Sequence, residues 1–165
     1  MKPIFSTEAA AIVISGLLLT SIPGMADPGP GGPFLGMSGR WSGAGTITMT
    51  NGSRERIHCK AAYTVTATGR AIQQTLNCAS DSYRLDINSN VVSEAGALSG
   101  SWSEGSRGVS GNVAGRTNGA EIVASVVGGG FTASLNVRTQ GDRQSVTIRP
   151  QGATDVAAVS IALRK

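Results

Sequence analysis

Cys59 and Cys78 are the only two cysteines of this chain, and the sequence between them has the pattern of a single β-hairpin. A turn at Thr68-Gly69 would place Cys59 directly opposite Cys78 on neighbouring antiparallel strands. In this register, the pairs on the cysteine side of the hairpin are mostly apolar and those on the other side are mostly polar. The cysteine-side pairs are Ala67 with Arg70, Val65 with Ile72, Tyr63 with Gln74 and Ala61 with Leu76. The sequence therefore predicts a disulfide between Cys59 and Cys78 on the inward face of the sheet.

Residues 1–26 have the pattern of a secretory signal peptide. Lys2 is followed by an apolar run from Ala9 to Leu19, a helix-breaking Pro23 and a small residue at Ala26. The apolar run is much shorter than the roughly 20 residues that a membrane-spanning helix needs. We therefore expect cleavage after Ala26, a periplasmic or secreted protein, and no integral membrane span in the mature chain. An oxidising compartment of this kind agrees with the expected disulfide.

After the predicted cleavage site, the chain begins with a segment rich in proline and glycine, residues 27–36. Such a segment cannot hold a helix or a central strand, because proline lacks a backbone N–H and fixes its φ angle. We expect it to be a flexible leader. Residues 37–165 have the length of one domain with a modest core, so a single β-barrel domain is expected there.

The net charge of +4 is carried mostly by arginines that are scattered singly along the chain, with few aromatic residues beside them. A nucleic-acid groove needs a concentrated basic surface, usually with stacking rings. The composition therefore argues against a nucleic-acid partner. The arginines are expected on solvated strand faces.

After residue 37, short β-branched runs alternate with turn residues and no helical period is sustained, which is typical of an all-β protein. Turn signals such as Asn51-Gly52 and Asn118-Gly119 are so closely spaced that successive strands must be antiparallel. The pattern predicts an up-and-down meander of about 8–10 short strands that closes into a small barrel or a curved sandwich. The expected strands cover residues 40–50, 55–67, 70–79, 83–88, 97–103, 108–115, 120–127, 131–139, 144–149 and 156–164.

The outward positions of the expected hairpin, such as Thr64, Gln73 and Thr75, are polar. A barrel embedded in an outer membrane needs the opposite, an apolar outer face bordered by aromatic girdles. The pattern therefore favours a soluble barrel.

The register of the first hairpin follows from matching apolar residues across it. Pairing Ile47 with Ile57 places Gly45 opposite Cys59 and leaves a three-residue loop at 51–53. The same register places Trp41 opposite Tyr63. A strict two-residue turn would pair Ile47 with Arg56 instead, and apolar pairing favours the first alternative.

Both tryptophans lie in a loosely repeated motif, MSGRWS at residues 37–42 and LSGSWS at residues 98–103. The simpler interpretation is that a glycine before a large ring marks two equivalent bends where a strand enters the core. The alternative is that the rings are presented to a ligand.

With Gly39-Arg40-Trp41 on the first strand and a basic residue, Arg164, on the last, the chain resembles the calycins, the barrel superfamily that includes lipocalins and avidins. The resemblance implies that Arg164 packs across Trp41. The chain is also similar to small secreted bacterial barrels that inhibit metalloproteases, which combine an early Gly-x-Trp, one disulfide and a free N-terminal segment. It resembles short exported Gram-negative proteins without an assigned function as well. The match to the inhibitor barrels covers mainly residues 37–78.

Little in the sequence points to catalysis. His58 is the sole histidine and should face solvent, and both cysteines are committed to a disulfide, so ligands for a transition metal are missing. No Gly-x-Ser-x-Gly motif presents a nucleophilic serine, and nothing places two carboxylates together. We therefore expect a protein that is not an enzyme and uses no metal or cofactor.

The leading hypothesis is an exported, non-enzymatic barrel that binds a small apolar molecule or an envelope protein. If the interior holds a cavity, the rings expected to line it are Trp41, Tyr63, Trp102 and Phe131. Inward positions such as Gly45 are small, and either fit a tapering barrel or leave such a cavity.

Two alternatives remain open. The first is a secreted protease inhibitor whose leader enters a protease cleft through Asp27, Pro28, Pro30, Pro33 and Phe34. The second is a structural or surface-interaction protein without a pocket.

Overall fold

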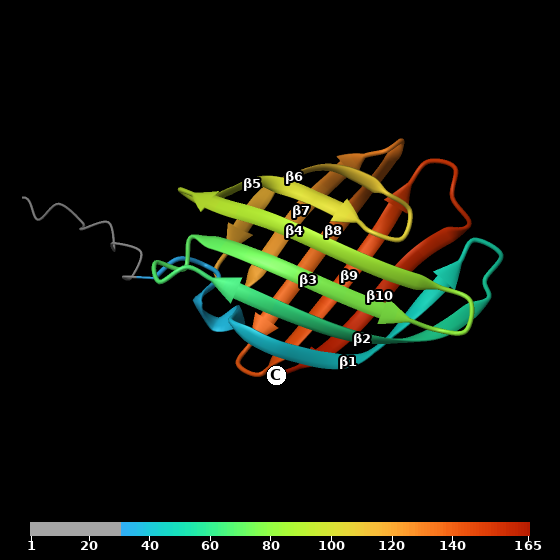
Figure 1. Cartoon of the computed structure of the whole chain (residues 1–165), viewed down its shortest axis with the longest axis horizontal. Helices are drawn as coiled ribbons and strands as arrows, with labels where there is room; N and C mark the ends of the chain where they lie inside the picture. The colour runs from blue at the N-terminus through green and yellow to red at the C-terminus, as the bar shows by residue number, and fades with distance from the viewer. Residues whose placement is uncertain (1–30) are drawn as a thin grey trace, which may run out of the picture.

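The computed structural model describes residues 31–165, which form a closed antiparallel barrel (Figure 1). Each strand pairs with its neighbours in sequence, and β10 returns to pair with β1, so the sheet has no free edge. The predicted all-β meander is confirmed, and it closes as a barrel. The predicted signal peptide, residues 1–26, lies outside the described residues. The elements are η1 (Leu35–Met37), β1 (Gly39–Met49), β2 (Arg54–Val65), β3 (Ala71–Ala79), β4 (Arg84–Glu94), β5 (Ala97–Glu104), β6 (Val109–Asn118), β7 (Glu121–Gly128), β8 (Phe131–Gln140), β9 (Arg143–Gln151) and β10 (Val156–Arg164).

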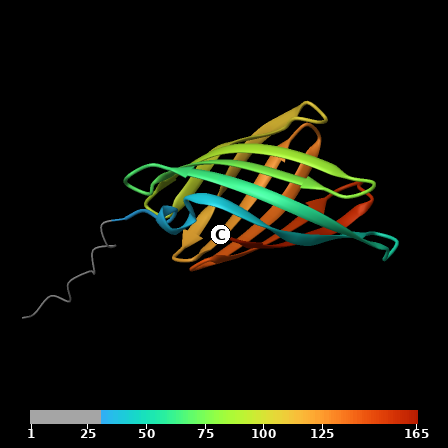
Figure 2. The ribbon, with the colours of Figure 1, turned by 60° about the horizontal axis from the view of Figure 1, so that its bottom comes forward.

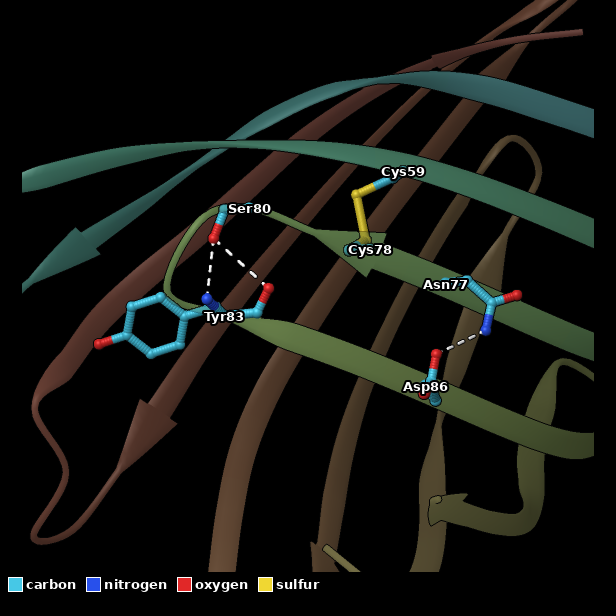
Figure 3. The surroundings of a disulfide bond; sticks show 6 residues. All are labelled: Cys59, Asn77, Cys78, Ser80, Tyr83 and Asp86. Atoms are coloured by element: carbon cyan, nitrogen blue, oxygen red, sulfur yellow. Dashed lines mark hydrogen bonds between the residues drawn. A yellow bond between two sulfur atoms is a disulfide. The ribbon is translucent and has the colours of Figure 1, made fainter. Parts of the chain in front are cut away.

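The hairpin of β2 and β3 has the predicted register. Cys59 lies opposite Cys78, and the two form a disulfide on the inward face. The turn residue Gly69 adopts a positive φ of 68°, a conformation that glycine tolerates best. Figure 3 shows the disulfide between the two strands, with Asn77 on β3 donating a hydrogen bond of 2.8 Å to Asp86 on β4. Along most of β2 and β3, inward and solvent-facing residues alternate.

The predicted register of the first hairpin is wrong by two residues. Ile47 lies opposite Glu55 and Gly45 opposite Ile57, so Trp41 faces Ala61. The connection between β1 and β2 spans residues 50–53 and is closed by two backbone hydrogen bonds with Met49, one from its N–H and one to its carbonyl. A shift of two residues keeps every side chain on the same face, so the predicted inward positions are unaffected.

Strand β4 is longer than predicted, because it continues through Asn88, Ser89 and Asn90 to Glu94. These polar residues have low strand propensity, but each one pairs with both β3 and β5. Pairing within the closed sheet therefore overrides the local preference.

Closure of the barrel brings β1 close to β10. Gly43 lies opposite Leu163, and a Cβ atom on Gly43 would collide with the backbone carbonyl of Ala162. Gly43 is therefore required by the close approach of the two strands, which at this position agrees with the first of the two alternatives, a tapering barrel.

The predicted flexible leader, residues 27–36, is only partly covered by the described residues, and the covered part is attached to the barrel. The N–H of Gly32 donates to Thr68 at 2.7 Å, and that of Phe34 donates to Gly69 at 3.1 Å. The Phe34 side chain is only 1% exposed. In Figures 1 and 2 this segment, in blue, lies beside the green turn between β2 and β3.

Within residues 32–36, a buried ring and two backbone hydrogen bonds thus hold the segment against the barrel. Across residues 31–165, no helix is long and apolar enough to cross a membrane.

Candidate functional site

The barrel interior contains a cavity of about 450 Å³. This volume lies within the roughly 300–1,000 Å³ that is usual for small-molecule sites. Phe34 and Met37, both buried, line one end. Arg107 and Gly129 line the other end and are also exposed to solvent, so the cavity reaches the surface there. The wall is mostly aliphatic and includes Leu76, Ile87, Val113, Ile122, Leu135 and Val146.

Three of the four rings that were predicted to line a cavity do so. Tyr63, Trp102 and Phe131 all contact it, from β2, β5 and β8 respectively. The rings of Trp102 and Phe131 meet edge to face, with centroids 6.0 Å apart. For Tyr63, the alternation of inward and outward residues in the predicted hairpin made this position predictable.

Trp41 does not line the cavity, so the prediction for this ring is wrong. Trp41 is 2% exposed and belongs to the hydrophobic core, where its Nε1 donates a hydrogen bond of 2.7 Å to the carbonyl of Met37. The rings of Trp41 and Tyr63 meet edge to face, with their centroids 6.3 Å apart. The two residues were predicted to be neighbours. Through its hydrogen bond to Met37, Trp41 therefore connects β1 to η1.

The cation over Trp41 is Lys165, whose Nζ lies 5.8 Å from the ring centroid. The resemblance to calycins implied Arg164 in this place. Leu163 points inward and residues alternate along β10, so Arg164 points outward. The next residue, Lys165, is the one that lies near Trp41.

The hydroxyl of Tyr63 takes part in a chain of side-chain hydrogen bonds. It donates to Oε1 of Gln144 at 2.6 Å, and Nε2 of Gln144 donates to the hydroxyl of Thr139 at 3.0 Å. Burial raises the pKa of Tyr63, an effect that the bond to Gln144 opposes only in part. The phenol therefore stays neutral and positions its ring in the cavity wall.

Glu104 lines the cavity at the end of β5 and is 4% exposed, a burial that was not predicted from the sequence. Its Oε1 accepts hydrogen bonds from the hydroxyl of Ser106 (2.5 Å), the N–H of Ser106 (3.2 Å) and the N–H of Asp86 (3.0 Å). Its Oε2 accepts from the N–H of Arg107 at 2.7 Å. Burial alone would raise the pKa of Glu104, but these hydrogen bonds together outweigh it and lower the pKa. The charged carboxylate thus holds the loop between β5 and β6 against β4.

Replacing Glu104 with glutamine is expected to lower the free energy of unfolding by about 1–3 kcal/mol near neutral pH, because buried N–H groups lose a charged acceptor. A carboxylate whose pKa is lower in the folded than in the unfolded protein stabilises the fold when the pH is above the unfolded-state pKa, about 4.3 for glutamate. This stabilisation is lost as the pH falls through the pKa of the folded state. The wild type should therefore lose this contribution below about pH 4, and the variant should not.

Equilibrium urea unfolding of Glu104→Gln across the acidic range measures this difference. The matched control is Glu94→Gln, because Glu94 is exposed at the end of β4. Identical pH slopes for wild type and Glu104→Gln would contradict the prediction.

The side chain of His58 is exposed, as predicted from its position next to Cys59. Within residues 31–165, no three His, Cys, Asp or Glu side chains are grouped closely enough to hold a metal ion. Two polar residues that line the cavity, Gln74 and Ser89, were not predicted as site residues. The signal that could have found Gln74 is its inward position, because it lies opposite Tyr63 in the predicted hairpin. Ser89 lies just beyond the strand expected at residues 83–88, so no such signal was available for it.

No known protein-family model matches this chain, and no curated protein matches it in sequence. Among solved structures, the chain is similar to Rv2717c from M. tuberculosis, with a TM-score of 0.64 and 12% sequence identity. The match covers 79% of this chain and 93% of that chain. At this identity the likeness concerns the fold alone, and it supports the barrel architecture.

Proposed function

We propose that the protein is an exported binding module that holds a small, mainly apolar molecule inside its barrel. The observation that carries the proposal is the cavity of about 450 Å³, which is closed at one end by Phe34 and reaches solvent beside Arg107. Apolar surface around an interior space of this size favours an apolar occupant. The cavity also favours this role over that of a structural protein without a pocket.

The environment of the polar groups supports binding over catalysis. The oxygens of Glu104 are engaged by the loop that follows it, and the Tyr63 hydroxyl is bound to Gln144. His58 lies on the outer face of the barrel. The disulfide supports export, because such bonds persist mainly in oxidising compartments. The calycin resemblance agrees with a ligand held inside a barrel.

The proposal is tested by titrating the mature protein with an uncharged naphthylamine dye whose fluorescence rises in apolar surroundings. Saturable binding is expected for the wild type. Val126→Trp should weaken it by about tenfold or more, because Val126 lines the cavity and a larger ring would fill part of it.

The matched control is Val127→Trp. Val127 is the next residue on β7, but it points outward and is 51% exposed. This variant should bind the dye as the wild type does. Thermal unfolding of both variants shows whether the fold is kept. Absence of saturable binding by the wild type, or equal weakening by both substitutions, would refute the proposal.

A further inference from the structure

One row of inward-facing residues, which crosses four adjacent strands, brings polar groups into the cavity wall. Tyr63 lies opposite Gln74, Gln74 opposite Ser89, and Ser89 opposite Trp102, on the adjacent strands β2, β3, β4 and β5. All four residues line the cavity. We call these four residues the polar row. The inward neighbours of Gln74 along its own strand are apolar, so the polar row is a local interruption of an apolar wall.

The polar row has donors without partners. The only side-chain hydrogen bond of Gln74 within residues 31–165 is a contact of 3.5 Å from the Ser89 hydroxyl to Oε1, which leaves the amide Nε2 unpaired. The indole N–H of Trp102 also has no partner, and this residue is 8% exposed. Buried polar groups are normally hydrogen-bonded, because an unpaired one is costly in an apolar environment. The Trp102 N–H is such a buried group, whereas Gln74 is half-buried and lines the cavity. A buried unpaired donor and an amide N–H that lines the cavity, both in one row, therefore call for an acceptor.

We infer that the ligand of the cavity is a mainly apolar molecule with one uncharged hydrogen-bond acceptor, such as a carbonyl oxygen, held by the polar row. This inference rests on the proposed function. The groups without partners, Nε2 of Gln74 and Nε1 of Trp102, are both donors, so the complementary ligand group is an acceptor. The acceptor is uncharged because the one basic residue in the described cavity lining, Arg107, is 55% exposed at the solvent end. An anion in the apolar interior would lack a compensating charge.

The test uses two probes of equal length, a medium-chain dialkyl ketone and the corresponding n-alkane, each displacing the naphthylamine dye from the mature protein. The ketone is expected to bind about tenfold more tightly than the alkane, because it pairs donors that the alkane leaves unpaired. A long-chain carboxylate is expected to bind more weakly than the ketone at neutral pH.

Two variants locate the effect. Gln74→Leu should remove most of the preference for the ketone while keeping alkane binding, because it replaces an amide by an apolar side chain of similar size. Trp102→Phe should reduce the preference further and keep a ring in the wall. The matched control is Gln73→Leu, because Gln73 is the preceding residue on β3 and points outward. This control should keep the full preference.

Equal affinity of the wild type for ketone and alkane would overturn the inference and leave the proposed function standing. An unchanged preference in both Gln74→Leu and Trp102→Phe would also overturn it. If neither probe displaces the dye because the dye itself does not bind, the proposed function fails, and the inference fails with it.

Discussion

Replacing Trp41 with alanine is expected to lower the free energy of unfolding by about 3–5 kcal/mol, the range for removing a large buried ring. The indole is 2% exposed, and its N–H donates to the carbonyl of Met37 at 2.7 Å. Alanine would leave a void in the core and would remove the hydrogen bond that connects β1 to Met37 of η1. Equilibrium unfolding in urea measures the loss.

The two tryptophans provide a matched comparison. Trp41→Phe should cost about 1–3 kcal/mol beyond the loss of ring volume, because the Met37 carbonyl would lose its partner. Trp102→Phe should cost less, because the N–H of Trp102 has no partner among residues 31–165 and its ring borders an existing cavity. Equal losses for the two variants would contradict this assignment of roles.

The fold could be predicted largely because its strongest signals are local. The turn at Gly69 and the two cysteines define one hairpin, and strict alternation along β2 and β3 then decides which side chains point inward. Short turns elsewhere make neighbouring strands antiparallel, and a long run of such strands closes on itself to remove its edges.

The register between β1 and β2 could not be predicted from apolar pairing alone. A shift of two residues preserves the inward face, so pairing Ile47 with Ile57 or with Glu55 leaves the same side chains buried. The observed register is accompanied by a contact distant in sequence, in which the carboxylate of Glu55 accepts a hydrogen bond of 2.9 Å from the N–H of Ser82. Local sequence contains no information about such a contact.

The cavity was only partly predictable for the same reason. Trp41 and Trp102 occupy equivalent places in a repeated motif, yet one packs against η1 and Lys165 and the other borders the cavity. Their environments differ because the N-terminal segment folds against only one of them. The burial of Glu104 depends likewise on a loop that wraps around its carboxylate.

Reduction of the disulfide between Cys59 and Cys78 is expected to lower the free energy of unfolding by about 3 kcal/mol. The bond closes a loop with a sequence separation of 19, and on the chain-entropy model a loop of that size restricts the unfolded state by about this amount. The midpoint of thermal unfolding should fall by roughly 10 °C. The folded barrel should persist, because the pairing of β2 with β3 continues on both sides of the bond.

The measurement compares oxidised and reduced wild-type protein with the double variant Cys59→Ala/Cys78→Ala under the same two conditions. The reductant should shift the wild type and leave the double variant unchanged. The double variant should be somewhat less stable than the reduced wild type, because both sulfur atoms are buried in the core and their removal leaves small voids. A reduced wild type that unfolds at the same midpoint as the oxidised protein would show that the hairpin does not need its covalent link.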